Sequence, residues 1–323
     1  MPVSCRASGA RTLRSGRCGA CWDGERLVRS RTRAKNAVHA ALRRNLKRGT
    51  AMADLFGAKG RRWLARLELP PHERRIVESC LREIDFLSQE IAALESELAK
   101  LALSSEQVKR LMTVPGVSLV SAATFAAVVG DIHRFETPKQ LVGYVGLDPK
   151  VRQSGEQAAR HGRISKQGSA PARHMLCEAA WIVVRTPGPL RAFYERLAAR
   201  RGPQIALVAT ARKLCVLFWH LLTSERDYAF GRPSLTRHKL RRLELLAGDP
   251  PRRGRRSGSK ASKREQRHER ELSEQVEQAY RRLVADWQRT PHKFGAGATP
   301  GRASSSHQTG QAARQGTAPN PAL

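Results

Sequence analysis

Acidic residues are scarce at the start of this sequence. Residues 1–70 hold only four, Asp23, Glu25, Asp54 and Glu68, and the whole chain of 323 residues carries a formal net charge of +31. This balance is far from that of an ordinary globular protein. It favours polyanionic partners, with nucleic acid as the first candidate and an anionic membrane surface as the second.

Long apolar runs and a secretory signal are also missing. We find no stretch that approaches the ~18 apolar residues that a membrane-spanning helix needs. The N-terminus is rich in arginine but has no apolar core, so it is not a secretory signal. We therefore expect a cytoplasmic protein without a membrane partner.

Cysteine pairs of the kind that hold zinc are too few. Cys18 and Cys21 form one CxxC, and the six cysteines of the chain provide no second pair. A structural zinc site usually takes four ligands from two such pairs. The sequence therefore predicts no metal ligands, and Cys80, Cys177 and Cys215 are expected to be small buried apolar groups.

Helical periodicity dominates the first half of the chain. Residues 26–48 predict a basic amphipathic helix, and 72–103 predict a long helix with an unbroken a/d heptad seam. The seam consists of Val77, Cys80, Ile84, Leu87, Ile91, Leu94, Leu98 and Leu101. We expect a coiled coil, formed either with the basic helix or with a second copy of the chain.

A Pro-Gly turn separates two helical patterns at 111–135 and resembles a helix-hairpin-helix. In that motif the backbone N–H groups of the turn hold a DNA phosphate without reading bases. Pro115, Gly116 and Val117 are therefore candidate DNA-binding residues. A plain helical hairpin would show the same pattern.

The loop at 148–168 combines serines, glycines and cations, and a short hairpin is possible there. Cations stabilise the charge that develops on a phosphodiester in its transition state, and they also simply bind phosphates. Both interpretations remain open on these grounds. The candidate DNA-binding side chains are Arg152, Arg160, His161, Arg163, Lys166 and Arg173.

The predicted fold is mostly α: a basic helix and a long coiled-coil helix, followed by a compact helical domain and a disordered basic tail. The expected divisions are an irregular segment 1–25, a basic helical linker 26–70, a coiled-coil helix 71–104, a helical domain 105–225, a basic helical extension 226–290 and a disordered tail 291–323.

Several segments in a fixed order resemble one known family. They are the PGV turn, "GDIHRF", "QLVGYVGLDP", the "SG" at 154–155 and "GRISKQG". Together they resemble the C-terminal domain of the DEDD-class insertion-sequence transposases, the group of insertion sequences 110, 116 and 902, related to the Piv-type DNA invertases. The resemblance covers about 111–222, with a weaker extension over 26–103.

The resemblance implies a site-specific DNA recombinase of a mobile element. In that family a serine attacks the DNA backbone, together with a Mg2+-binding RNase-H-like domain, and a noncoding guide RNA can select the DNA sites. The family's serine falls on Ser154, and Ser165 is our second choice. A homo-oligomer through the coiled coil is expected.

One departure from the family concerns its acidic metal ligands, which precede the "LVRSRTR" stretch. Only 25 residues precede that stretch here, and they hold two acids. We therefore expect a truncated, catalytically incomplete copy in which the ligands of Mg2+ are not found. The segment after 232 could be an out-of-frame scar. The alternatives are a non-catalytic nucleic-acid-binding protein and a dominant-negative coiled-coil partner of full-length transposase.

Overall fold

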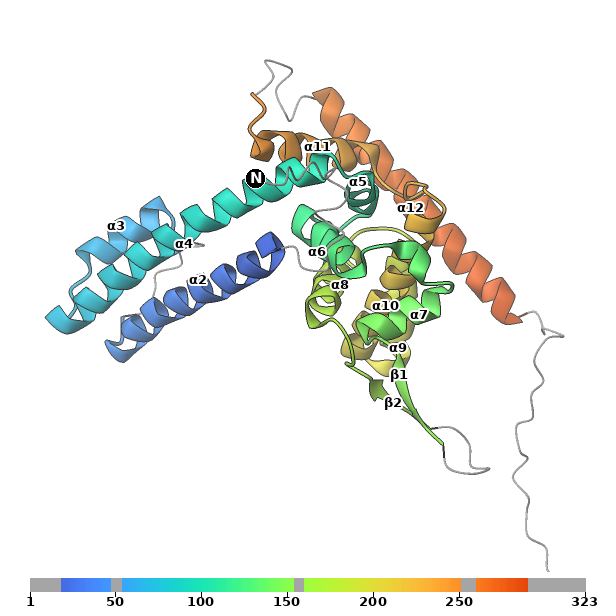
Figure 1. The fold of residues 1–323 in the computed structure, drawn as a ribbon, viewed down its shortest axis with the longest axis horizontal. Coiled ribbons are helices and arrows are strands. Elements are labelled where there is room, and N and C mark those ends of the chain that lie inside the picture. The colour runs from blue at the N-terminus through green and yellow to red at the C-terminus, as the bar shows by residue number, and fades with distance from the viewer. Residues whose placement is uncertain (1–18, 48–53, 154–159, 251–259, 290–323) are drawn as a thin grey trace, which may run out of the picture. The chain divides into compact units, whose positions relative to one another are not determined.

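The structure is a computed structural model that describes residues 19–47, 54–153, 160–250 and 260–289 (Figure 1). It confirms a mostly helical fold. The elements of its first half are α2 (Gly19–Arg44), α3 (Ala58–Arg66), α4 (Pro71–Leu103), α5 (Glu106–Met112), α6 (Leu119–Val129), the 3-10 helix η1 (Ile132–Arg134) and α7 (Pro138–Val145). Those of its second half are β1 (Pro149–Arg152), β2 (Arg160–Ile164), α8 (Ala170–Val183), α9 (Pro189–Arg201), α10 (Pro203–Thr223), α11 (Pro233–Ala247) and α12 (Lys260–Arg289). One compact unit of the chain extends through Arg282.

The basic helix α2 and the heptad helix α4 pack on each other within one chain (Figure 1). Arg44 near the end of α2 donates two hydrogen bonds of 2.8 Å to Glu73 near the start of α4, so the two helices run antiparallel. Val38 and Ala41 of α2 lie in one buried cluster with Val77 of α4. We expected the heptad helix to pair either with the basic helix or with a second copy of the chain. The structure shows it packed on the basic helix.

Helix α2 begins earlier than we predicted. Residues 19–25 are helical, so the prediction of irregular structure through residue 25 is wrong for this stretch. Ion pairs along the helix supply the reason, because Glu25 accepts a hydrogen bond of 2.5 Å from Arg29 and Asp23 lies 3.7 Å from Arg26. Pairs at this spacing stabilise a helical turn even without an apolar period.

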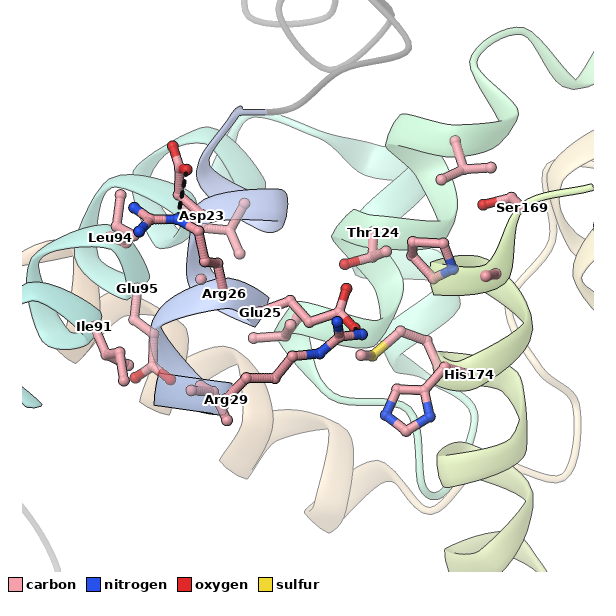
Figure 2. A pocket seen from close by; sticks show the side chains of 18 of the residues that line it. Asp23, Glu25, Arg26, Arg29, Ile91, Leu94, Glu95, Thr124, Ser169 and His174 are labelled. Atoms are coloured by element: carbon pink, nitrogen blue, oxygen red, sulfur yellow. Dashed lines mark hydrogen bonds and ion pairs between the residues drawn. The ribbon is translucent and has the colours of Figure 1, made fainter. Parts of the chain in front are cut away.

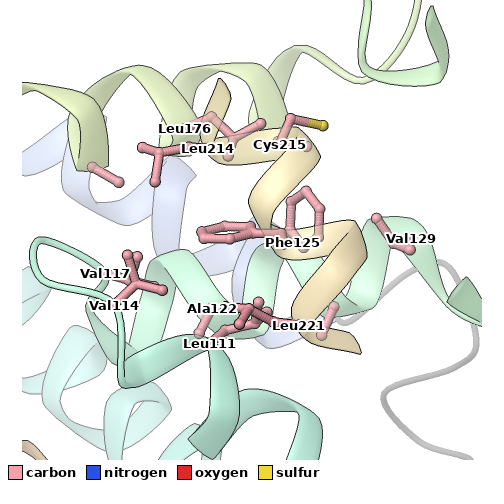
Figure 3. Packing of buried hydrophobic residues seen from close by; sticks show 14 of the residues in the cluster. Leu111, Val114, Val117, Ala122, Phe125, Val129, Leu176, Leu214, Cys215 and Leu221 are labelled. Carbon is pink, nitrogen blue, oxygen red and sulfur yellow. The ribbon is translucent and has the colours of Figure 1, made fainter. Parts of the chain in front are cut away.

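The main core lies among helices α5 to α10 (Figure 3). Phe125 of α6 and Phe218 of α10 meet edge to face at its centre, with ring centroids 4.9 Å apart. The side chains of 121–127 are buried, and most of them are small, which lets α5 and α8 approach α6 closely. Cys215 is fully buried, as expected, and burial raises the pKa of its thiol to about 12.

Helix α10 meets the length and composition of a membrane-spanning helix, so our statement that no stretch approaches this length is wrong. Half of its apolar window is buried inside the protein, where Leu214 and Phe218 belong to the core. A core helix and a lipid-facing helix share one composition, because both remove apolar side chains from water. The tertiary packing identifies α10 as a core helix.

The Pro115-Gly116 turn belongs to the core. Pro115 and Val117 are buried, and Gly116 has a φ of +83°. A Cβ atom on Gly116 would lie 2.8 Å from the carbonyl oxygen of Ala179 in α8. The turn therefore needs glycine for packing. DNA binding by Pro115, Gly116 and Val117 finds no support in this arrangement, since a phosphate would have to reach a turn that is packed on α8.

Lys239 of α11 contacts the chain just before the same turn. Its Nζ donates hydrogen bonds of 2.8 Å to the carbonyl oxygens of Met112 and Val114 at the end of α5. A cation at this place satisfies carbonyls that the helix leaves unpaired. Burial, helped by the charge of Arg232, lowers the pKa of Lys239 to about 8.

Helix α12 joins the body through a buried carboxylate. Glu277 accepts hydrogen bonds from the backbone N–H of Gly188 at 2.9 Å, from Arg191 at 3.0 Å and from Arg281 at 2.6 Å. Leu243 of α11 is also buried. This matched packing argues against an out-of-frame scar after residue 232, because random sequence would not place a buried carboxylate opposite two arginines.

We predict that Glu277→Gln lowers the free energy of unfolding by roughly 2–3 kcal/mol at neutral pH, since it takes the buried negative charge away from the half-buried Arg191 and the exposed Arg281. Burial raises the pKa of Glu277, but the hydrogen bonds from Arg191, Arg281 and Gly188 outweigh it, and the net pKa lies below its ordinary value. The stabilisation is therefore complete above the unfolded pKa of about 4.3 and is lost as the pH falls through the folded pKa.

Thermal unfolding of both proteins at neutral pH and in acid measures this difference, which should shrink in acid. The matched control is Glu271→Gln, because Glu271 lies exposed on the same helix. Equal losses of unfolding free energy in the two variants would show that the buried carboxylate of Glu277 contributes no more than an exposed one.

Candidate functional site

A two-stranded antiparallel hairpin carries most of the predicted site. Strands β1 and β2 pair with Val151 opposite His161 and Arg152 opposite Arg160, and a bulge interrupts the register near Pro149. The first-choice nucleophile, Ser154, lies in 154–159, outside the described residues.

The base of the hairpin is closed by the second-choice serine. The hydroxyl of Ser165 donates a hydrogen bond of 2.5 Å to Oδ1 of Asp148, and both residues are half-buried. The backbone N–H of Ser165 also donates to the carbonyl oxygen of Asp148 at 2.8 Å. A hydroxyl that donates to a carboxylate can be a nucleophile whose proton the carboxylate removes. It can equally be a structural group that holds the two strands together at the base of the hairpin.

Two glycines allow this base to lie against the helical domain. Gly146 ends α7 in the left-handed conformation, and a Cβ atom there would lie 2.2 Å from the carbonyl oxygen of Gln167. Gly168, with a φ of +120°, would place a Cβ atom 2.0 Å from the carbonyl oxygen of Tyr144. Side chains at either position would push the hairpin off the domain.

The predicted cations take different places. Arg163 and Lys166 are exposed and free to meet a phosphate. Arg173 is half-buried and donates a hydrogen bond of 2.9 Å to the carbonyl oxygen of Val145, so it caps the end of α7 instead of pointing to solvent. Three further predicted cations, Arg152, Arg160 and His161, belong to the strands, and the structure describes only their backbone. Ser169, in contrast, caps α8 by accepting from the N–H of Ala172 at 3.4 Å.

Two features near the hairpin were not foreseen. The partner of Ser165, Asp148, lies 17 positions away, and no local pattern connects the two. The guanidinium of Arg134 lies 4.5 Å from the ring centroid of Phe135 and 4.4 Å from that of Tyr144. The "GDIHRF" and "YVGL" segments contain these residues, but only the fold shows that they meet.

A cavity of about 1450 Å³ lies between α2, α4, α6 and α8 (Figure 2). Its walls include the apolar Leu98, Val120 and Met175. Its charged lining consists of Asp23, Glu25, Glu95, Arg26, Arg29 and Arg33, so acids and bases are balanced. Such a lining does not select a polyanion, and the hairpin remains the better candidate for a phosphate backbone.

Carboxylates that could hold Mg2+ do not come together in the part of the chain that the structure describes. No group of three or more His, Cys, Asp or Glu side chains is arranged there to hold a metal ion. Asp23 and Glu25, the acids nearest the N-terminus, face Arg26 and Arg29 instead. The described residues therefore do not fit a hard divalent cation, which needs several converging oxygen ligands.

Comparison with known proteins gives relatives of one kind. The chain is 31% identical over 220 residues to the transposase for insertion sequence element IS1111A of Coxiella burnetii, covering 64% of this chain and 58% of that one. It is 30% identical over 219 residues to a probable family 20 transposase of Pseudomonas aeruginosa, covering 64% and 63%. It is 26% identical over 204 residues to the transposase for insertion sequence element IS1328 of Yersinia enterocolitica, covering 61% and 60%.

The matched part therefore spans less than two thirds of the length of these relatives. Within it, residues 108–195 match the sequence model of the transposase IS116/IS110/IS902 family. This segment runs from α5 through the hairpin to α9, and so contains the Pro-Gly turn, the hairpin base and most of the core. By this match and by its relatives, the chain is similar to insertion-sequence transposases, and its similarity to the IS116/IS110/IS902 family extends over residues 108–195.

Proposed function

We propose that this chain is the DNA-binding and strand-transferring part of an insertion-sequence transposase of the DEDD class. The observation that carries the proposal is the cationic hairpin fixed on the family-matched domain. Its base is held by Asp148 and Ser165, and exposed Arg163 and Lys166 follow its second strand. These exposed cations would meet the charge of a phosphodiester.

The proposed chemistry is a transesterification. The hydroxyl oxygen of Ser154 forms a bond to phosphorus while the bond from phosphorus to one deoxyribose oxygen breaks. The serine proton passes to a base, and the departing oxygen takes up a proton. Because the phosphodiester is conserved as a protein–DNA bond, the reversed step joins the strand to a new partner.

Ser165 is the alternative nucleophile in this proposal. Its hydroxyl already donates to Asp148, which would then act as the general base. Its half-buried place at the base of the hairpin also suits a clasp that orients the loop. We rank Ser154 first because a structural role in the hydrogen bond to Asp148 is enough to explain Ser165.

The resemblance brings Mg2+ with it, but the described carboxylates do not fit that ion, and no step is derived through it. We propose that the chain is catalytically incomplete by itself and that the metal-binding domain acts from elsewhere. A guide RNA and a homo-oligomer belong to the same proposal. The seam of α4 packs on α2, so an oligomer would need other surfaces or an exchange of α2.

A second candidate function is non-catalytic nucleic-acid binding, including interference with a full-length transposase. The lack of converging carboxylates in the described residues favours it. Both candidates bind DNA. They differ in whether a covalent protein–DNA bond forms.

We predict steeply salt-dependent DNA binding. If the hairpin and neighbouring cations neutralise about five phosphates, the slope of log affinity against log salt should lie near −4 to −5. Fluorescence anisotropy with the element's end as duplex DNA, over a salt series, gives this slope. A slope near zero would remove the basis of both candidate functions.

We predict that the chain forms a covalent adduct with nicked DNA from its own element's ends when Mg2+ and a full-length relative, which supplies the metal-binding domain, are both present. Ser154→Ala should abolish the adduct, and Ser104→Ala, an exposed serine at the end of α4, should leave it unchanged. Denaturing gels resolve the adduct by size.

Each outcome of this assay assigns a function. An adduct that survives Ser154→Ala and disappears in Ser165→Ala would move the nucleophile to Ser165. Salt-sensitive binding without any adduct, even when a full-length relative is added, would favour the non-catalytic candidate.

A further inference from the structure

The α9–α10 helical hairpin has an unusual charge composition. Residues 189–223 contain six arginines and lysines but only one acidic residue, Glu195. That carboxylate is already engaged, because its oxygens lie 3.8 Å from Arg191 and within ion-pair distance of Arg281 of α12. Arg191 in turn is held by Glu277. The remaining cations form what we call the basic α9–α10 face: Arg196, Arg200, Arg201, Arg212 and Lys213.

No ion pair within 4.0 Å joins these five cations to a carboxylate in the part of the chain that the structure describes. All are exposed except Arg196, which is half-buried. Elsewhere, arginines on the C-terminal helices do find partners, such as Arg237 with Glu265 and Arg281 with Glu277. The basic face is thus left uncompensated on a body that pairs many of its other arginines.

Packing brings cations from both helices of this face together. The guanidinium carbon of Arg196 in α9 lies 5.6 Å from the ring centroid of Phe193, and Nζ of Lys213 in α10 lies 5.9 Å from the same centroid. The ring attracts both cations, but they repel each other across it. Arg200 follows Arg196 by one helical turn, and Arg212 adjoins Lys213, so the positive charge continues beyond the ring.

A group of like charges without acids nearby is stabilised by a polyanion. The ring of Phe193 holds two of the cations near each other, which favours a ligand with several negative charges. A phosphodiester backbone offers regularly spaced single negative charges, and it binds arginine and lysine without base contacts. Balanced charges make the cavity beside α2 a poorer match for such a ligand.

We propose that the basic α9–α10 face is a second DNA-backbone-binding surface, built on elements other than the serine hairpin. This inference rests on the proposed function, because strand transfer has to hold two DNA segments, the one that is cut and the one that is joined. The face binds duplex DNA through its phosphates, with little dependence on base sequence.

The test compares two triple variants of the full chain. Arg200→Gln, Arg212→Gln and Lys213→Gln together neutralise the basic face. Lys59→Gln, Arg62→Gln and Arg66→Gln together neutralise three exposed cations of α3 and change the net charge equally. Anisotropy measures the affinity of each protein for a short duplex DNA and for a single-stranded RNA, both of arbitrary sequence, over a salt series, and circular dichroism verifies that each is folded.

We expect the face variant to lose about two to three units of the salt slope and roughly 10- to 100-fold in affinity, while the α3 variant changes little. Equal changes in both variants would overturn the proposal, because net charge alone would then explain them. Loss of binding to single-stranded RNA with duplex binding unchanged would also overturn it and assign the face to RNA.

Failure of this inference can be distinguished from failure of the proposed function. A wild-type slope near zero removes DNA binding altogether, and the proposed function fails with it. A steep wild-type slope that persists in the face variant overturns this inference alone. Should the triple variant misfold, Arg212→Gln by itself should still lower the slope by about one unit, and an unchanged slope in that variant would overturn the proposal.

Discussion

The close backbone contact between the hairpin base and the α7–α8 corner is the constraint on which the candidate site depends. Gly146 and Gly168 bring the chain to distances at which a Cβ atom would lie 2.2 Å and 2.0 Å from carbonyl oxygens. Since only glycine permits this approach, the orientation of the hairpin is set by backbone geometry, and the bond between Ser165 and Asp148 completes it. The strands themselves are too short to be stable alone.

Charge has two separate uses in this protein. Arginines that meet carboxylates fasten helices to each other, as Arg44 does with Glu73 and Arg191 with Glu277. Cations without such partners, on the hairpin and on the basic α9–α10 face, remain available to a phosphate backbone. Part of the net charge of +31 therefore serves the fold.

Periodicity predicted several helices correctly because each has one continuous apolar side. The heptad seam at 72–103 became α4, and the basic amphipathic pattern at 26–48 became most of α2. The Pro115-Gly116 turn shows the limit of this reasoning. Proline and glycine indicate that the chain turns, but only the fold shows that the turn packs on Ala179 of α8. The pairing of Ser165 with Asp148, 17 residues apart, likewise left no local signal.

The sequence by itself determined the helical class and the similarity to transposases, and its charge predicted polyanionic partners, since composition, period and motif order are properties of the chain alone. Only the tertiary structure decided which cations are paired, which turn is buried and that α10 is a core helix. Burial and ion pairing depend on neighbours that are distant in sequence, such as Glu277 at Gly188 and Lys239 at Met112. Such contacts exist only once the chain has folded.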